Sequence, residues 1–410
     1  MKILFLSEEF PPENAGGSGI IAHNLAHELK NLGHDVFIIT CTERNSEEKE
    51  ADIDGLRVFK VCGSYHSRWQ AWLSLYNPLT VPKIEKIVKN IKPDIVHAHN
   101  IHNYISYYSL KIAKKYAKAV FLTAHDVMLV HWGKLMPKNG NCFYKVTTKD
   151  QIKEAGKRYN PFRRVIIKHY LRYVDKIFTV SDAIKKILAI NGINNTETIH
   201  NGINVEEWKF SPLEIKKFNE KYNLQNKKII LFAGRLSGAK GGHEILRAIS
   251  LVKDEIKNVI LLVAGEKNKY FEEMNKLIEN LNIDEYVKFT GWLSREEMKS
   301  AFFASDISVT PSIYLDPFPT VNLEAMASRK PIIGTCFGGT SEIVVNNRTG
   351  YLVNPLNTKE MADKIIDLLK NPQRMKQFGD EGYKRVKENF SLKRQTEKTL
   401  LNYYIFLKKK

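Results

Sequence analysis

The 410 residues and 47.2 kDa of this chain give room for two or three domains, each with its own core, and exclude a disulfide mini-protein. Apolar residues make up 43% and charged residues 26%, a globular composition that excludes a disordered chain. Lys and Arg (63) outnumber Asp and Glu (45), and the formal net charge of +18 favours anionic partners: nucleic acid, acidic lipid, or nucleotide and sugar phosphates.

The apolar runs are all short. Residues 3–6 are too few for a signal-peptide core, and residues 259–264 fall far below the ~20 that a membrane helix needs. We therefore expect a cytoplasmic protein, with a peripheral position at the inner membrane face as the alternative. The cysteines lie too far apart for a CxxC motif and indicate buried or free thiols: Cys41, Cys62, Cys142 and Cys336.

The first half of the chain alternates short apolar runs with helical patterns. Residues 2–7 predict a strand, and the apolar spacing after it predicts a helix over 18–32 that Gly33 ends. Strands that are apolar on both faces and alternate with helices predict a parallel sheet covered on both sides. Further strands are predicted at 36–40, 56–61, 95–98, 120–123, 177–180 and 198–199.

Residues 205–227 are polar and mixed, and we interpret them as the connection between two halves. The alternating pattern then restarts and predicts a second doubly wound domain. A basic helical stretch, about 378–410, ends the chain; it packs on the body with a solvated tail, or alternatively contacts a membrane surface. Strands are predicted at 228–233, 259–264, 287–290, 307–310 and 332–334, and helices around 241–252, 270–281, 295–304 and 319–328.

The predicted fold class is therefore α/β, with two doubly wound, Rossmann-like domains facing across a cleft. We place the first domain at 1–204, completed by a C-terminal helix at about 390–410, and the second at 205–389. Ligands of such sheets bind at the C-terminal ends of the strands, so the cleft between the domains is the expected active site.

Two glycine-rich loops are candidates for phosphate binding. Residues 8–19 (EEFPPENAGGSG) lead from the first strand into a helix, where backbone amides and the helix dipole favour an anion, although a tight turn explains the glycines equally well. The loop matches neither GxGxxG nor a P-loop. Residues 234–242 (GRLSGAKGG) carry Arg235 and Lys240, two cations that can converge on a diphosphate; the alternative is a solvated basic loop.

Residues 311–327 (PSIYLDPFPTVNLEAMA) form a proline-rich loop that turns into a helix near Pro319. Asp316 in the loop can accept hydrogen bonds from sugar hydroxyls, and Glu324 in the helix can chelate a ribose diol. Charge placement at the helix N-terminus is an alternative explanation for Asp316, and it suits Glu324 less well because that residue lies in an otherwise apolar stretch.

Three other features carry weaker signals. The histidines His97, His99 and His102 end a strand, where hydrogen bonding to a ligand or to the core is commoner than a metal site, and His99 is a candidate contact to the acceptor. Residues 52–54 (DID) resemble a metal-binding DxD but are interpreted as a turn. The basic stretch 157–172 is either a solvated helix face or a docking face for anionic lipid.

Seven segments in one order make nearly the whole chain resemble the retaining, nucleotide-sugar-dependent glycosyltransferases of the GT-B fold, family-4 type. Each segment alone is a weak signal. The segments are PENAGG at 12–17, TAHD at 123–126, VSD at 180–182, HNGIN at 200–204, GRLSGAKGG at 234–242, the 311–327 segment, and GGTSEIV at 338–344.

The resemblance implies roles for individual residues of the second domain. Arg235 and Lys240 would neutralise the leaving diphosphate, Glu324 would bind the nucleotide ribose, and Asp316 would contact the donor sugar. The start of the helix would bind the donor at Pro319, Thr320 and Val321, and the backbone amides of Thr320 and Val321 would donate hydrogen bonds to it.

For the first domain the resemblance places His125 near the reacting carbon and the sugar hydroxyls, and Gly16 and Gly17 near the diphosphate. Two departures stand out: the family's usual loop residue at position 316 is Glu, one methylene longer than Asp, and Pro319 and Thr320 replace a Gly-hydrophobic pair.

The implied reaction transfers a hexose, with retention and without a metal or another cofactor, from a nucleotide diphosphate sugar to a glycan, lipid-linked or small-molecule acceptor. One alternative is a nucleotide-sugar epimerase or hydrolase of the same fold. A remote alternative is a non-enzymatic nucleic-acid binder, for which the sequence shows no recognition module, so no nucleic-acid partner is expected.

Overall fold

The computed structural model describes residues 1–12, 16–138 and 140–408, and the chain divides into two compact units. Unit 1 comprises Met1–Leu135, Phe143–Gly202 and Leu392–Lys410, and unit 2 comprises Met136–Cys142 and Ile203–Ser391. The short segment 136–142, which the sequence analysis placed in the first domain, groups with unit 2.

The described residues of unit 1 form one eight-stranded sheet in the order β3-β4-β2-β1-β5-β6-β7-β8. Every neighbouring pair is parallel except β3 with β4, which is antiparallel. The strands are β1 (Lys2–Ser7), β2 (Asp35–Thr42), β3 (Lys49–Ile53), β4 (Leu56–Cys62), β5 (Ile95–His99), β6 (Ala119–Ala124), β7 (Lys176–Thr179) and β8 (Thr196–Thr198).

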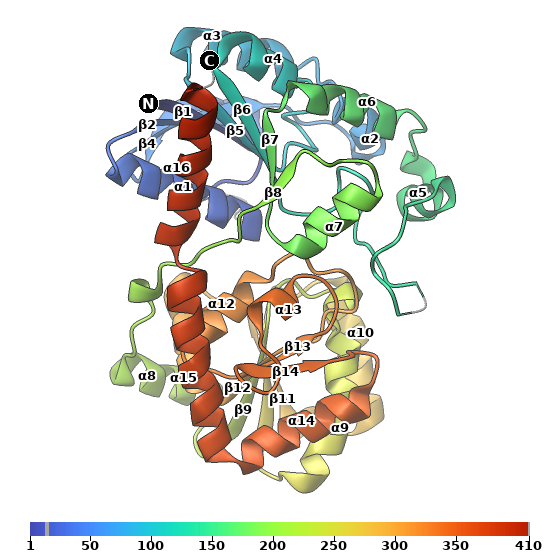
Figure 1. The fold of residues 1–410 in the computed structure, drawn as a ribbon. Helices are drawn as coiled ribbons and strands as arrows, with labels where there is room; N and C mark the ends of the chain where they lie inside the picture. The colour runs from blue at the N-terminus through green and yellow to red at the C-terminus, as the bar shows by residue number, and fades with distance from the viewer. Residues whose placement is uncertain (13–15, 139, 409–410) are drawn as a thin grey trace. The chain divides into compact units, whose positions relative to one another are not determined.

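Helices of unit 1 cover both faces of this sheet because its central strands are apolar throughout. Ile3 and Phe5 of β1 pack in a core with α1 and α16, while Leu4 and Leu6 of the same strand are equally buried on the other face. Figure 1 shows α16, in red, beside α1. The helices are α1 (Gly17–Asn31), α2 (Gln70–Leu73), α3 (Val81–Ile91), α4 (Ser109–Tyr116), α5 (Thr148–Ala155), α6 (Arg163–Tyr170), α7 (Asp182–Ile190) and α16 (Leu392–Lys408).

Unit 2 has a parallel six-stranded sheet in the order β11-β10-β9-β12-β13-β14. Helices α9, α10 and α14 pack together on one side of it, and α8, α11, α12 and α15 follow one another on the other (Figure 1). Its strands are β9 (Lys228–Ala233), β10 (Val259–Ala264), β11 (Val287–Gly291), β12 (Ile307–Thr310), β13 (Ile332–Thr335) and β14 (Gly350–Val353).

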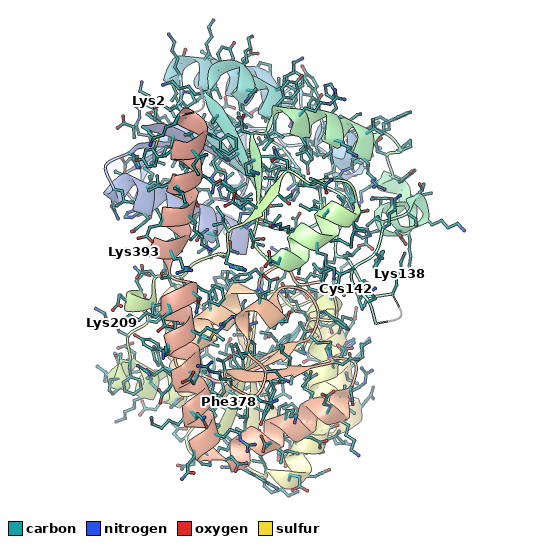
Figure 2. All side chains as sticks on the ribbon, viewed as in Figure 1. Lys2, Lys138, Cys142, Lys209, Phe378 and Lys393 are labelled. Atoms are coloured by element: carbon teal, nitrogen blue, oxygen red, sulfur yellow. The ribbon has the colours of Figure 1, made fainter. Side chains whose placement is uncertain are left out.

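The core of unit 2 joins the sheet to these helices. Phe378 of α15, labelled in Figure 2, packs edge to face against Tyr351 of β14, with ring centroids 5.4 Å apart. The helices are α8 (Pro212–Tyr222), α9 (Gly242–Glu255), α10 (Lys269–Leu281), α11 (Arg295–Ala304), α12 (Thr320–Ala327), α13 (Thr340–Ile343), α14 (Thr358–Lys370) and α15 (Pro372–Asn389). Among the helices in the described part of the chain, none has the length and apolar character needed to cross a membrane.

The two α/β units confirm the predicted α/β fold class, and several elements differ from the predictions: α14 was not predicted, and the helical stretch predicted at about 378–410 is divided between α15 and α16. Strand β3 is an antiparallel edge strand that includes Asp52 and Ile53. Of residues 52–54, which were predicted to form a turn, only Asp54 lies in the turn, together with Gly55. The connection between the halves contains α8, which begins after Ser211. Strand β14 at the other sheet edge was also missed.

Candidate functional site

The loop that follows β9 lies against the loop that follows β12. Gly241, at the start of α9, has a φ of +80°, and a Cβ there would lie 1.9 Å from the carbonyl oxygen of Pro311. Only glycine fits this position. The amide of Ile313 donates to the carbonyl of Ala239 at 2.9 Å, so the backbones of the two loops are joined directly.

Lys240 and Asp316 form an ion pair between these loops. The Nζ of Lys240 lies 2.7 Å from Oδ2 of Asp316, and the hydroxyl of Ser312 donates to the same oxygen at 2.7 Å. The side chain of Asp316 is buried. Two residues that the resemblance assigned to different parts of the donor are therefore in direct contact with each other.

A third loop, after β13, holds the backbone of Asp316. The amide of Gly339 donates to the carbonyl oxygen of Asp316 at 2.8 Å. Gly338 has a φ of +73°, and a Cβ there would lie 2.2 Å from that oxygen. Since β9, β12 and β13 are neighbours in a parallel sheet, the loops after three successive strands form one site in unit 2.

Lys240 remains charged in this site. Burial alone would lower the pKa of its amine, but the Asp316 carboxylate and the Tyr314 side chain offset this and hold the pKa above its ordinary value. Arg235, in contrast, is exposed to solvent. The loop after β9 thus carries two cations: the ammonium of Lys240, which is held by the Asp316 carboxylate, and the solvent-exposed guanidinium of Arg235.

Helix α12 brings its N-terminus to the same end of the sheet. Pro319 is the N-cap and Thr320 the first helical residue, so the amides of Thr320 and Val321 have no partner within the helix. The hydroxyl of Thr310 in β12 and Oδ1 of Asn322 lie 2.9 Å apart, which ties the first turn of the helix to the strand. These free amides favour a negatively charged group.

Glu324 lies one turn into α12 between buried apolar neighbours. Burial raises the pKa of its carboxyl to about 7, and the positive charge of Arg295 offsets only part of this effect. Such a carboxyl changes protonation near neutral pH, a property common at binding and catalytic sites.

In unit 1 the predicted glycine positions lie at the start of α1. Gly16 is the N-cap and Gly17 the first helical residue, while the three residues before them lie outside the described part. The hydroxyl of Ser18 donates to the Glu9 carboxylate at 2.8 Å, and a Cβ on Gly16 would lie 2.4 Å from the same carboxylate oxygen. A carboxylate therefore already lies beside the helix N-terminus where a phosphate was predicted.

His125 follows β6 and is joined to a second histidine. Its Nε2 lies 2.9 Å from Nδ1 of His99, and burial lowers the pKa of His125 to about 4. Burial likewise lowers the pKa of His97 to about 3 and that of His99 well below its ordinary value. Both ring nitrogens of His97 are engaged, at 2.7 Å, by Tyr403 and Thr123. Of the two roles that the sequence analysis favoured, hydrogen bonding to a ligand or to the core, His97 has the second.

Glu8, the residue after β1, was missed by sequence reasoning. Its Oε1 accepts hydrogen bonds from the amides of Asn103 and Ile105 at 2.8 and 2.9 Å, and burial raises its pKa to about 8. Its second oxygen has no partner among the described residues. The sequence signal for Glu8 is a carboxylate directly after a buried parallel strand, in the same loop as the glycines predicted to bind phosphate.

The predicted site residues therefore fall into two groups. Arg235, Lys240, Asp316, Pro319, Thr320, Val321 and Glu324 belong to unit 2, and Gly16, Gly17 and His125 belong to unit 1.

Two sequence families match this chain. The profile described as Glycosyltransferase Family 4 matches residues 15–207, and the profile described as Glycosyl transferases group 1 matches residues 214–385. An uncharacterized glycosyltransferase of Methanocaldococcus jannaschii is 26% identical over 386 residues, which cover 89% of this chain and 89% of the relative.

Solved structures share the architecture. Sucrose-phosphate synthase from Thermosynechococcus elongatus has a TM-score of 0.81 at 19% identity, with 100% of both chains covered. Anabaena HepE, solved in complex with UDP-glucose, has a TM-score of 0.73 at 18% identity, covering 98% of this chain and 100% of HepE. At these identities the likeness shows a common fold.

Proposed function

This chain is a glycosyltransferase of the group 1 and family-4 type, with the GT-B fold, and we propose that it transfers a hexose from a nucleotide diphosphate sugar to a hydroxyl group of its acceptor. The acceptor is a glycan, a lipid-linked saccharide or a small molecule. UDP-glucose is the first donor to test, because the structurally similar HepE was solved with it.

The observation that carries the proposal is the ion pair of Lys240 with Asp316 at the meeting point of three strand ends. Negative charge develops on the diphosphate as the bond to the sugar breaks. The ammonium of Lys240, held by Asp316, and the exposed guanidinium of Arg235 stabilise that charge. Groups fixed before the reaction need no reorganisation during it, so catalysis proceeds by electrostatics and positioning without a metal.

Helix α12 binds the nucleotide end of the donor. Amides at its first turn, Thr320 and Val321, contact the diphosphate, and Glu324 accepts hydrogen bonds from the ribose hydroxyls. The raised pKa of Glu324 supports this role. Burial removes hydrogen bonds from water to the carboxylate, and the ribose hydroxyls would replace them.

Retention at the anomeric carbon is proposed to follow from attack on the face that the diphosphate leaves. The acceptor oxygen forms its bond to the anomeric carbon as the bond from that carbon to phosphate oxygen breaks, and the departing phosphate takes the acceptor's proton. Asp316 is an unsuitable nucleophile, since its Oδ2 is already engaged by Lys240 and Ser312. Burial lowers the pKa of His125, so its imidazole is neutral and able to hydrogen-bond a sugar hydroxyl, the role that the resemblance implies for it.

The test begins with thermal unfolding of the protein with a panel of nucleotides and nucleotide sugars in the presence of EDTA, because a ligand bound only by the folded state raises the Tm. Donors that shift the Tm are then incubated with candidate acceptors, and the anomeric configuration of the product is read by NMR. A product formed without acceptor would instead indicate an epimerase or hydrolase.

Variants then test the two cations. We expect Arg235→Ala and Lys240→Ala each to lower kcat by ~100-fold, as loss of one fixed charge stabiliser commonly does. Arg247→Ala, on the exposed surface of α9, is the matched control and should leave kcat unchanged. Wild-type turnover in either of the first two variants, or activity that disappears with EDTA, would contradict the proposed chemistry.

A further inference from the structure

Large apolar side chains are exposed together on one surface of unit 1, which we name the aromatic-basic surface. Each is between 45% and 71% exposed, far more than a core residue of its type. They come from two places: residues 69–79, which include α2, and the start of α6. The members are Trp69, Trp72, Tyr76, Leu79, Phe162 and Val165.

Contacts join the two places into one surface. The side-chain amide of Asn160 donates to the carbonyl of Ala71 at 2.9 Å, which fixes the segment before α6 to α2. The rings of Tyr76 and Tyr108 lie 4.9 Å apart, and those of Tyr108 and Tyr170 5.8 Å apart, so α6 and residue 76 flank the start of α4. Figure 1 shows α2 beside α6.

The segments that form the aromatic-basic surface carry positive charge only. Residues 66–81, 104–118 and 156–173 contain eleven Lys and Arg and no Asp or Glu. Three of the lysines, in α4 and just after it, pair with carboxylates from other segments. Exposed cations that remain around the apolar side chains are Arg68, Lys111, Lys157, Lys168 and Arg172.

A groove of about 300 Å³ runs along α6 at this surface. Its walls include the apolar side chains of Leu129, Val130 and Val165, and it also presents the cations Arg164 and Lys168. Apolar walls beside two cations suit an acyl chain next to a phosphate.

We propose that the aromatic-basic surface docks on a membrane that contains anionic phospholipid. Trp and Tyr side chains favour the boundary between water and acyl chains, Phe, Leu and Val insert below it, and Lys and Arg attract the lipid phosphates. The aliphatic members distinguish a membrane from a saccharide or a nucleic acid, because those ligands stack on aromatic faces and gain little from Leu79 or Val165. This docking goes beyond the transfer reaction and does not depend on it.

Vesicle flotation without donor or acceptor tests the proposal on the full chain. The wild-type protein should bind vesicles that contain about one third phosphatidylglycerol, bind pure phosphatidylcholine weakly, and lose affinity as salt rises. Trp72→Ser with Phe162→Ser, and separately Lys168→Glu with Arg172→Glu, should each reduce the partition coefficient at least ~10-fold. The controls should bind as the wild type does: Phe210→Ser for the apolar change, and Lys227→Glu with Lys257→Glu for the charge change, all exposed in unit 2.

Tryptophan fluorescence gives a second test of membrane docking, and its main result comes from the wild-type protein alone. Brominated lipid should quench part of the tryptophan fluorescence of the wild type, and Trp69→Phe with Trp72→Phe should remove that quenching. Absence of binding to anionic vesicles would overturn the proposal, as would equal losses in the control variants. Binding to a single-stranded oligonucleotide that the same surface variants abolish, without vesicle binding, would assign the surface to nucleic acid and also overturn it.

Discussion

Glu324 should make donor binding depend on pH. Burial raises the pKa of its carboxyl to about 7 in the free protein. The proposed contact with the ribose hydroxyls uses the ionised carboxylate, which only accepts hydrogen bonds. Donor binding therefore favours the deprotonated form, and affinity should rise as pH rises through 7.

The magnitude follows from the ionised fraction. A group with a pKa of about 7 is roughly 90% ionised at pH 8 and roughly 10% at pH 6. If the bound carboxylate stays ionised down to pH 6, the Kd should be about 10-fold higher at pH 6 than at pH 8, or about 1.4 kcal/mol.

Isothermal titration calorimetry with UDP-glucose at constant ionic strength measures this change. The donor's diphosphate is esterified at both ends and does not titrate in this range, so the protein is the source of the pH dependence. Glu324→Gln is the control, because glutamine retains an acceptor oxygen of similar reach but does not titrate. Its Kd should vary with pH much less than that of the wild type.

Two results would refute the reasoning. Identical pH profiles in the wild type and Glu324→Gln would show that this carboxyl does not titrate at the ribose. Tighter binding at pH 6 than at pH 8 would show that the protonated acid, acting as a donor, makes the contact.

Gly338→Ala should destabilise the protein by about 2–4 kcal/mol and weaken donor binding, because the new Cβ meets the backbone of Asp316 and the φ is positive. Urea unfolding checks this, with Gly33→Ala as the control whose φ is also positive but whose Cβ meets open space; equal losses would remove the steric argument. Glu8→Gln should remove a pH dependence of stability. Because the pKa of Glu8 is raised to about 8, the free energy of unfolding of the wild type should fall by about 2 kcal/mol between pH 6 and pH 8 relative to that of the variant. A difference in unfolding free energy between the two proteins that stays constant over this range would contradict the burial of an ionisable carboxyl.

Strands with a continuous apolar run were the elements that the sequence predicted well. The run over 259–264 became β10, and its helix-forming neighbours followed at the expected places. The edge strand β3 carries Lys49, Glu50 and Asp52, and such charged edges lack the apolar signal of a central strand. Helix α8 buries only Phe218 and Tyr222, so its polar composition concealed it.

Loop positions in the site were predictable, but the partnerships within them were not. A single sequence shows that Arg235 and Lys240 follow one strand and Asp316 another. That Lys240 contacts Asp316, 76 residues away, depends on the pairing of β9 with β12 and on the turn at Gly241. The raised pKa values of Glu8 and Glu324 depend on burial, which appears only when the surrounding elements are packed.

The return of α16 to unit 1 has a consequence for how the chain is made. During translation β1 and β5 leave the ribosome early, yet Tyr403, whose hydroxyl pairs with His97, is synthesised 306 residues after that histidine. Until then the face of the sheet that α16 covers stays open, while the whole of Ile203–Ser391 is synthesised and free to fold. The nascent N-terminal half therefore exposes apolar surface during translation, as chains that chaperones bind do, and we expect a chain cut before Leu392 to keep that face exposed.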